Sequence, residues 1–306
     1  MNLNSLYTHS LKPFRGSFAL EGVAAEVHAS RNELRLNDDA ATFMSFAGFF
    51  AVCMTTAALL FAFGGYEAGF HTINSLARHL PEDFLQITTF VGDTAVALCL
   101  MLFFARRNPS LLFIILLAAI YGTLVTHGMK AYFDMLRPPA VLNSDDFVQI
   151  GQAFKRASFP SGHSATVFIM VSCLYYFATQ ISTKVVLVTF GAWVAISRVL
   201  VGAHWPVDIL VGSGVGVIVT TIAIYSAKRW SWGFSVRVHF FVLSLLIAAA
   251  IMLFSHSGGY PNVSLFAKLC ATASLTFFVA DYFFSPYVPK GSGTTSHRPP
   301  SQLAKS

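Results

Sequence analysis

The chain has 306 residues, of which 55% are hydrophobic and only 11% are charged. A soluble domain carries roughly 25% charged residues, so this composition excludes an ordinary soluble protein and indicates a membrane protein. The net charge of +6 is spread between apolar segments, a pattern that fits membrane topology signals and argues against a nucleic-acid-binding patch. The four cysteines lie inside apolar segments, where packing roles are expected instead of disulfide bonds or a zinc site.

Residues 1–40 precede the first apolar segment and are polar and mixed in charge. They lack the apolar core and small-residue cleavage site of a signal peptide, so we expect a cytoplasmic tail. A membrane-spanning helix needs about 20 apolar residues. Eight later stretches fit this length, the last two less clearly because they contain Lys268 and Asp281. The eight stretches are residues 41–64, 85–105, 110–131, 161–180, 184–203, 206–227, 237–256 and 262–284.

Between the first two predicted spans, residues 66–80 mix apolar side chains such as Phe70 with polar ones such as Asn74. This mixture predicts a short amphipathic helix that lies in the membrane interface. Pro81 should end that helix, because proline lacks the backbone N–H that a helix interior requires.

The basic residues indicate how the chain is oriented. Most of the 20 Lys and Arg residues fall on the side of the N-terminus, so we expect the N-terminus in the cytoplasm. Eight spans then return the C-terminus to the same side. The expected fold is an all-α, polytopic membrane helix bundle. It comprises a tail at 1–40, a six-helix core at 41–228, about two extra transmembrane helices at 229–286, and a disordered cytoplasmic tail at 287–306.

Asp93 lies about eight residues into the second predicted span, which at about 1.5 Å per residue is about 12 Å deep. An ionisable residue at such a depth is a candidate for function. Two interpretations are equally open. Asp93 either pairs with a cation of the active site without touching the substrate itself, or it is a structural residue held by hydrogen bonds.

Three clusters of polar residues interrupt the apolar pattern, and the first runs from Lys130 to Pro138. Lys130 and Arg137 are seven residues apart, about two helical turns, so their side chains share one face. Pro138 restricts the residue before it and should stop the helix. The two cations either bind an anion or reach out to the membrane interface, as cations near helix ends commonly do.

The second cluster, Pro160-Ser161-Gly162-His163, opens the fourth predicted span. A helix N-terminus offers unpaired N–H groups and partial positive charge, which suit an anion. Gly162 allows a phosphate to approach the backbone closely, and Ser161 adds a hydroxyl donor. The alternative is an ordinary helix cap, but a cap does not require the imidazole of His163.

The third cluster is the stretch from Ser197 to Asp208, between the fifth and sixth predicted spans. Pro206 fits the first position of the sixth helix, which puts His204 in the preceding turn and Asp208 in the first helical turn. The aspartate can then bond one imidazole nitrogen and leave the other free to attack. The alternative is that Asp208 only complements the helix dipole while His204 lies idle.

Counting the spans places all three clusters at the same face of the membrane. Together they gather three cations, two histidines, one aspartate and a helix N-terminus. Phosphoryl transfer needs this kind of positioning and charge neutralisation. No Asp/Glu pair or His cluster suggests a metal site, so we expect the cations to take the place of a metal.

Taken in order, the clusters resemble the three-part signature of the type-2 phosphatidic acid phosphatase superfamily. The signature comprises Lys130 with Arg137-Pro138, then Pro160-Ser161-Gly162-His163, then Ser197-Arg198 with His204 and Asp208. It lies within residues 130–208, and the resemblance implies that the six-helix core is the phosphatase.

The resemblance also implies a role for each residue. His204 would attack phosphorus and form a phosphohistidine, while Asp208 would orient it and stabilise its charge. His163 would protonate the leaving oxygen and then activate water. The phosphate oxygens would be held by Lys130, Arg137, Ser161, Gly162 and Arg198. Membrane members of the family typically act on lipid phosphates or diphosphates without a metal, so we expect neither metal nor cofactor.

The expected function is therefore that of a lipid phosphatase in a bacterial inner membrane, with its site at the periplasmic face. The expected substrates are polyprenyl diphosphates such as undecaprenyl diphosphate, slightly ahead of phosphatidylglycerol phosphate, phosphatidic acid and lipid A phosphates. A phosphotransferase that uses the same phosphohistidine is the alternative enzyme. A non-catalytic phospholipid binder or transporter is the alternative outside catalysis. We expect no nucleic-acid partner, and the sequence predicts no oligomeric state.

Overall fold

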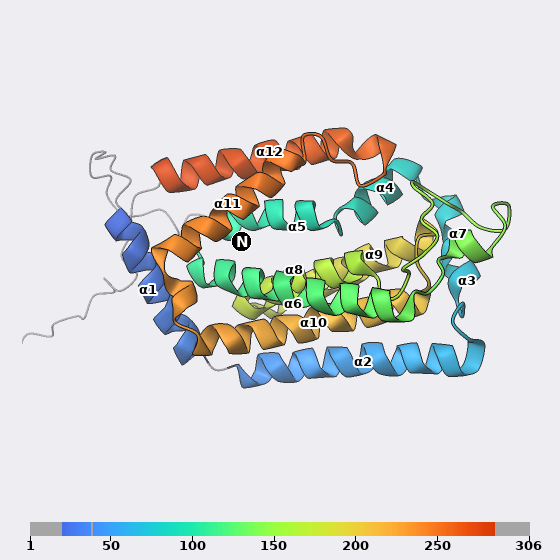
Figure 1. Ribbon diagram of the computed structural model, residues 1–306, viewed down its shortest axis with the longest axis horizontal. Coiled ribbons are helices and arrows are strands. Elements are labelled where there is room, and N and C mark those ends of the chain that lie inside the picture. Colours follow the sequence, from blue (N-terminus) through green and yellow to red (C-terminus); the bar gives the residue numbers. More distant parts are fainter. Residues whose placement is uncertain (1–19, 38, 285–306) are drawn as a thin grey trace, which may run out of the picture.

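Apolar helices lie side by side along one axis of the computed structural model, which describes residues 20–37 and 39–284 (Figure 1). Within these residues the chain forms helices, turns and loops but no strand. The predicted tail at 287–306 lies outside the described residues. The α-helices are α1 (Leu20–Leu36), α2 (Ala40–Gly64), α3 (Phe70–Ser75), α4 (Glu82–Phe90), α5 (Thr94–Met101), α6 (Pro109–Phe133), α7 (Pro138–Val141), α8 (Gly162–Phe177), α9 (Ile181–Leu200), α10 (Pro206–Arg229), α11 (Val236–Met252) and α12 (Ser264–Val279).

The eight predicted spans agree with these helices in position, but the helices differ in length. Among the described residues, five helical segments are long and apolar enough to cross a membrane, and a bent pair would make a sixth. The five are Ala40–Gly64, Pro109–Val141, Ile181–Leu200, Pro206–Arg229 and Pro261–Phe284. Helices α8 and α11 are shorter, with 16 and 17 residues. The all-α, polytopic bundle is therefore confirmed, and the chain is an integral membrane protein.

The second predicted span is broken into α4 and α5, which meet at an angle of 66°. Asp93 begins α5 because its side chain accepts a hydrogen bond from the backbone N–H of Ala95, at 2.8 Å. At Gly92, a Cβ atom would lie 3.1 Å from the Cβ of His163, so the absence of a side chain lets the break pack closely against α8. The break therefore lies beside one of the predicted catalytic histidines.

The predicted amphipathic helix at 66–80 is present as α3, followed by a 3₁₀ turn over Leu76–His79. Asn74 is only 2% exposed, although the sequence suggested a polar surface residue. Its side-chain amide donates to the carbonyl oxygens of Val199 and Leu200 at the end of α9, at 3.1 and 3.0 Å. Its carbonyl oxygen accepts from the N–H of Val148, at 2.8 Å. Helix α3 is thus pinned to the end of α9.

Part of the predicted N-terminal tail is folded onto the bundle as α1, which packs against α6 and α11. The buried hydroxyl of Ser30 accepts a hydrogen bond from the N–H of Ser110, near the start of α6, at 2.8 Å. The C-terminal helices pack on the same side of the core, because α11 contacts α5 and α6 while α12 contacts α5. Figure 1 shows α12 and α2 on opposite sides of the bundle.

Helix α10 lies at the centre and packs against α2, α6 and α8. Its glycines make the contact with α8 unusually close. A Cβ atom at Gly212 would lie 2.5 Å from the carbonyl oxygen of Ser161, and one at Gly216 would lie 2.5 Å from that of Ala165. The backbones can approach this closely only because both residues lack a side chain. This contact fixes the start of α8 beside the start of α10, where the second and third clusters lie.

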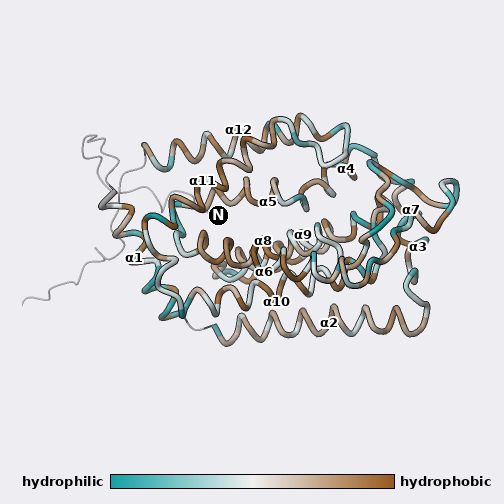
Figure 2. Tube along the Cα trace, in the orientation of Figure 1, coloured by the Kyte–Doolittle hydropathy of each residue, from teal (hydrophilic) through white to brown (hydrophobic). Residues whose placement is uncertain are grey.

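Hydrophilic residues gather near the two ends of the bundle, around α1 and around α7, while the middle of the helices is mostly hydrophobic (Figure 2). The polar end around α7 holds the predicted catalytic residues.

We expect Gly216→Ala to destabilise the protein by about 1–3 kcal/mol, because the new methyl group must displace the backbone of α8. The measurement is the midpoint of thermal unfolding in detergent. Gly48→Ala in α2 is the matched control, since a Cβ atom there would meet nothing within 4 Å. Equal unfolding midpoints for the two variants would show that the α8–α10 contact is not tight.

Candidate active site

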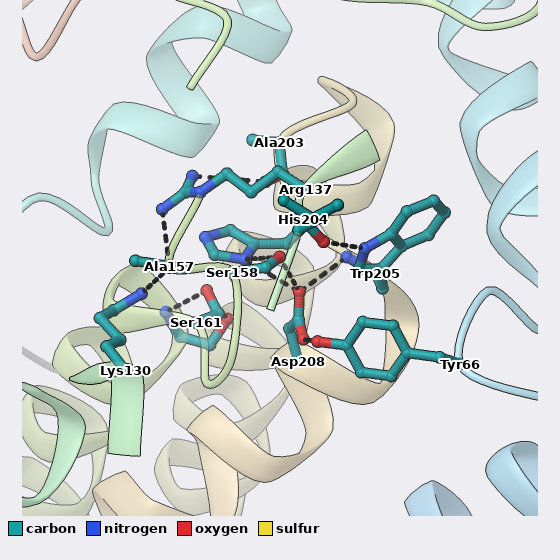
Figure 3. A network of polar contacts seen from close by, with 12 residues as sticks. Tyr66, Lys130, Arg137, Ala157, Ser158, Ser161, Ala203, His204, Trp205 and Asp208 are labelled. Carbon is teal, nitrogen blue, oxygen red and sulfur yellow. Dashed lines mark hydrogen bonds and ion pairs between the residues drawn. The ribbon is translucent and has the colours of Figure 1, made fainter. Parts of the chain in front are cut away.

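The three polar clusters come together at the end of the bundle that carries α7 (Figures 1 and 3). Lys130 comes from the last turn of α6, and Arg137 directly precedes α7. Ser161 caps α8, and Asp208 lies in the first turn of α10. The clusters that helix counting assigned to one face are therefore neighbours in space.

His204 and Asp208 form a buried pair. His204 is 1% exposed and Asp208 is 0% exposed. The Nδ1 atom of His204 lies 3.2 Å from Oδ2 of Asp208, and Pro206 occupies the first turn of α10 between them. With Nδ1–H donating to the carboxylate, the lone pair of Nε2 is free to act as a nucleophile.

Three further donors hold the carboxylate of Asp208. Its Oδ2 atom accepts from the hydroxyl of Ser158 at 2.5 Å and from the backbone N–H of Trp205 at 3.0 Å. The hydroxyl of Tyr66, from the turn after α2, donates to Oδ1 (Figure 3). Sequence reasoning identified neither Tyr66 nor Ser158. Ser158 could have been noticed because it lies two residues before Pro160, whereas Tyr66 is 142 residues from its partner.

The surroundings of His204 keep its imidazole uncharged. Burial, and then the positive charges of Arg137, Arg198 and Lys130, lower the pKa of His204 well below its ordinary value. Burial, and then the charge of Asp208, raise the pKa of Tyr66, so that its phenol remains a hydrogen-bond donor. The imidazole of His204 is therefore neutral in this environment, which is the form that a nucleophile requires.

Lys130 and Arg137 are held by backbone carbonyl groups. The Nζ atom of Lys130 donates to the oxygen of Ala157 at 2.6 Å. The guanidinium of Arg137 donates to the oxygens of Arg156 at 3.0 Å, Ala157 at 3.4 Å and Ala203 at 3.4 Å. These contacts fix the position of both cations and leave their charges uncompensated.

Arg198, in the last turn of α9, is 3% exposed. Its Nη1 atom donates to the hydroxyl oxygens of Thr89 at 2.7 Å and Tyr260 at 2.6 Å. Over the residues that the structure describes, no Asp or Glu pairs with Arg198, Lys130 or Arg137. Nor does any group of three His, Cys, Asp or Glu side chains within that part of the chain come close enough to hold a metal ion.

The start of α8 brings Gly162 and His163 to the same cavity. A Cβ atom at Gly162 would meet nothing within 4 Å, so space is open beside this backbone. Ser161 is 0% exposed, and its hydroxyl oxygen caps the helix by accepting from the N–H of Ser164 at 3.4 Å. Its predicted contact with a phosphate stays a prediction, because this hydroxyl is engaged as a cap and does not line the cavity.

Two buried nitrogen atoms at the cavity have no hydrogen-bond partner among the described residues, namely Nε2 of His163 and Nε of Arg198. Buried polar atoms are nearly always paired, so unpaired ones at a cavity indicate a place for a ligand. Both residues belong to the set predicted from the sequence.

The cavity has a volume of about 340 Å³ and two contrasting ends. The polar end contains Lys130, Arg137, His163, Arg198 and His204. The other end lies between α5, α6 and α8 and is apolar. Its lining includes Ala97, Leu98, Met101, Ile115, Ala119, Gly122, Ala165, Ile169 and Met170.

Asp93 has a different partner from the one that sequence reasoning considered. Its Oδ2 atom lies 3.0 Å from Nε2 of His256, in the loop after α11, while Oδ1 caps α5. It therefore does not pair with Lys130, Arg137 or Arg198. The physical reason is the break at Gly92, which turns Asp93 toward the C-terminal extension.

Residues 110–232 match the family model of the PAP2 superfamily. The chain is also 28% identical over 155 residues to the lipid A 1-phosphatase of Rhizobium etli, and the match covers 43% of this chain and 65% of that relative. The chain thus spans less than two thirds of the length of this relative. The crystal structure of Aquifex aeolicus LpxE is similar at 26% identity with a TM-score of 0.47, covering 51% of this chain and 92% of that one.

We expect His204 to be neutral at about pH 6 and to carry its proton on Nδ1, because its pKa is lowered and Asp208 accepts from Nδ1. The measurement is a nitrogen–proton correlation spectrum of the histidine side chains in detergent, with His204→Gln identifying the signal. A doubly protonated ring at this pH, or a proton on Nε2, would contradict the expectation.

Proposed function

We propose that the chain is a lipid phosphatase. The proposal is supported by the match of residues 110–232 to the family model of the PAP2 superfamily, the family that the sequence signature resembles. The proposed reaction is hydrolysis of a lipid phosphate or diphosphate through a phosphohistidine at His204. One observation carries the proposal: the cavity joins a cationic end that holds both histidines to an apolar end between three helices.

The dimensions of the cavity suit an amphiphilic substrate. Helix α6 contributes to both ends, with Lys130 at the polar end and Ile115 at the apolar end. These residues are 15 positions apart, which at about 1.5 Å per residue is about 22 Å. A phosphate group at the polar end would therefore place an attached hydrocarbon chain along α6, where apolar side chains exclude water.

In the proposed complex, the phosphate oxygens are neutralised by Lys130, Arg137 and Arg198. The backbone at Gly162 adds the N–H groups and the dipole of the N-terminus of α8. These groups are fixed before the substrate binds, so little reorganisation is needed as negative charge develops in the transition state.

In the first step, the lone pair of Nε2 of His204 attacks phosphorus and the bond from phosphorus to the leaving oxygen breaks. His163 gives its proton to that oxygen, so that the lipid alcohol, or the lipid monophosphate, leaves uncharged at the cleaved oxygen. Asp208 stabilises the positive charge that His204 acquires, through the bond to Nδ1.

In the second step, His163 takes a proton from water, whose oxygen attacks phosphorus. The bond between phosphorus and Nε2 of His204 breaks, and inorganic phosphate leaves. Both histidines then return to their starting protonation states. The same intermediate would support transfer to a second lipid if a lipid hydroxyl, in place of water, reached the phosphorus.

The substrates we propose are lipids of the bacterial envelope. The relative from Rhizobium etli is named for the 1-phosphate of lipid A, which favours a phosphate of lipid A as substrate. Polyprenyl diphosphates, phosphatidylglycerol phosphate and phosphatidic acid share the same combination of phosphate and apolar chain. We place the chain in the inner membrane, and the distribution of Lys and Arg supports an orientation with the site at the periplasmic face and both termini in the cytoplasm.

We expect the purified chain to release phosphate from at least one lipid of a panel that contains these four classes, in detergent and with chelator present. His204→Ala should lower kcat at least about a thousandfold, because it removes the nucleophile. His79→Ala is the matched control, since this histidine is exposed and outside the cavity. Release is measured as free inorganic phosphate and as the dephosphorylated lipid.

Three outcomes would overturn parts of this proposal. Full release by His204→Ala would exclude the phosphohistidine. Phosphate that appears on a second lipid, with none released, would identify a phosphotransferase. No turnover of any lipid by folded protein would favour a binder of phospholipids.

We expect Tyr66→Phe to lower kcat about tenfold or more with little change in KM, because Asp208 loses a donor that orients it toward His204. Tyr132→Phe is the control for the same chemical change, since Tyr132 is 83% exposed on α6. Steady-state kinetics on the best lipid of the panel give both constants. A change in KM alone would assign Tyr66 to substrate binding instead.

A further inference from the structure

The loop that joins α11 to α12, residues 253–260, reaches the polar end of the cavity. It lies outside the segment matched to the PAP2 superfamily, which ends at residue 232. Gly258 and Tyr260 from this loop nevertheless line the same cavity as His163 and His204. The loop therefore adds a wall to a site whose reacting groups come from another part of the chain.

Within this loop, Tyr260 contacts Arg198 directly. The residue is 5% exposed, and its hydroxyl oxygen accepts a hydrogen bond from Nη1 of Arg198 at 2.6 Å. The guanidinium carbon of Arg198 lies 6.0 Å from the centre of the Tyr260 ring. Arg198 is thus held by an oxygen and lies near the aromatic face of the same side chain.

The loop is fixed from several directions. His256 pairs with Asp93, and just after the loop the backbone N–H of Asn262 donates to the side chain of Gln86 at 3.0 Å. Gly151 lies against the Tyr260 ring so closely that a Cβ atom would come within 2.5 Å of it. At Gly151 the backbone also has a φ of +78°, which favours glycine. These contacts leave the Tyr260 side chain little freedom to move away from Arg198.

The acceptors of Arg198 are neutral oxygens, and this matters for binding an anion. A carboxylate in the place of Tyr260 would cancel the charge of the guanidinium. The hydroxyl groups of Tyr260 and Thr89 instead fix the plane of the guanidinium and keep its charge available. The Nε atom of Arg198 remains unpaired at the cavity.

We propose that Tyr260 is a positioning residue that orients Arg198 for the phosphate group, which makes the loop at 253–260 part of the active site. The inference rests on the proposed function only in taking the polar end of the cavity as a phosphate site. It is specific to this chain's C-terminal extension, which the resemblance to the family does not cover.

The test is binding of inorganic phosphate to the purified full-length chain in detergent, measured by calorimetry and by the shift of the unfolding midpoint. Tyr260→Phe should raise the Kd for phosphate about tenfold, because Arg198 loses a fixed acceptor. Tyr282→Phe is the matched control. Tyr282 is also buried in the extension, at 7% exposure, but its hydroxyl contacts His239 away from the cavity.

A second pair of variants asks whether Tyr260 acts through Arg198. In an Arg198→Lys background, Tyr260→Phe should change the Kd less than about twofold, since the geometry that Tyr260 fixes is already lost. A full tenfold effect in that background would overturn the proposal. An unchanged Kd in Tyr260→Phe, or an equal change in Tyr282→Phe, would overturn it as well.

The lipid panel separates this inference from the proposed function. If the wild-type chain hydrolyses no lipid but binds phosphate, and Tyr260→Phe weakens that binding, the phosphatase proposal fails and the positioning role stands. If lipids are hydrolysed and Tyr260→Phe matches the wild type in Kd and kcat/KM, only the positioning role fails. A wild-type chain that binds no phosphate overturns the positioning role, and turnover then decides the function separately.

Discussion

Three cations share one cavity, and none of them has a carboxylate partner within residues 20–37 and 39–284; the rest of the site depends on this constraint. Like charges repel strongly where water is scarce, so Lys130, Arg137 and Arg198 are costly to hold together. Among the described residues, their hydrogen bonds go to oxygens of carbonyl and hydroxyl groups, which accept from the N–H groups without neutralising the charge. Such an arrangement is best stabilised by an anion with several negative charges, which is what a phosphate group provides.

The same cations determine the state of His204. Its partner Asp208 would by itself favour the protonated imidazole, but burial and the nearby positive charges outweigh it and lower the pKa of His204. Asp208 is also shared among donors, since Ser158, Tyr66 and the N–H of Trp205 take part of its hydrogen-bonding capacity. The pair is therefore arranged to orient a neutral imidazole. In the proposed complex, the negative charge of a phosphate would offset that of the cations and so favour the positive charge that His204 would gain on attack.

The sequence predicts most of this site because its key residues lie at the ends of helices. Pro138, Pro160 and Pro206 mark where helices end or begin, and the number of spans between them determines which ends share a face. The pairing of His204 with Asp208 also follows from the local chain, because the two residues are four positions apart across a helix start.

The residues that the sequence did not predict contact partners that are far away along the chain. Tyr66 and Tyr260 contact partners 142 and 62 residues away, and only the packing of helices brings them together. The 66° bend at Gly92 was also missed, since the stretch around it is apolar enough to be taken as one continuous span. That bend gives Asp93 its histidine partner, and Thr89, just before it, accepts a hydrogen bond from Arg198. Contacts of this kind depend on tertiary structure and leave no regular spacing in the chain.

Residues 110–232 and the segments outside them contribute different groups to the site. The segment at 110–232 supplies the groups proposed to touch the phosphate, and its glycines lock α8 against α10. The segments outside it contribute Thr89 and Tyr260, which bond to Arg198, and Tyr66, which bonds to Asp208. The cations and the proposed nucleophile thus lie within residues 110–232, whereas their orientation depends partly on segments outside that range. Under the proposed function, changes in the flanking segments would alter how tightly the phosphate is held without any change in the residues proposed to react with it.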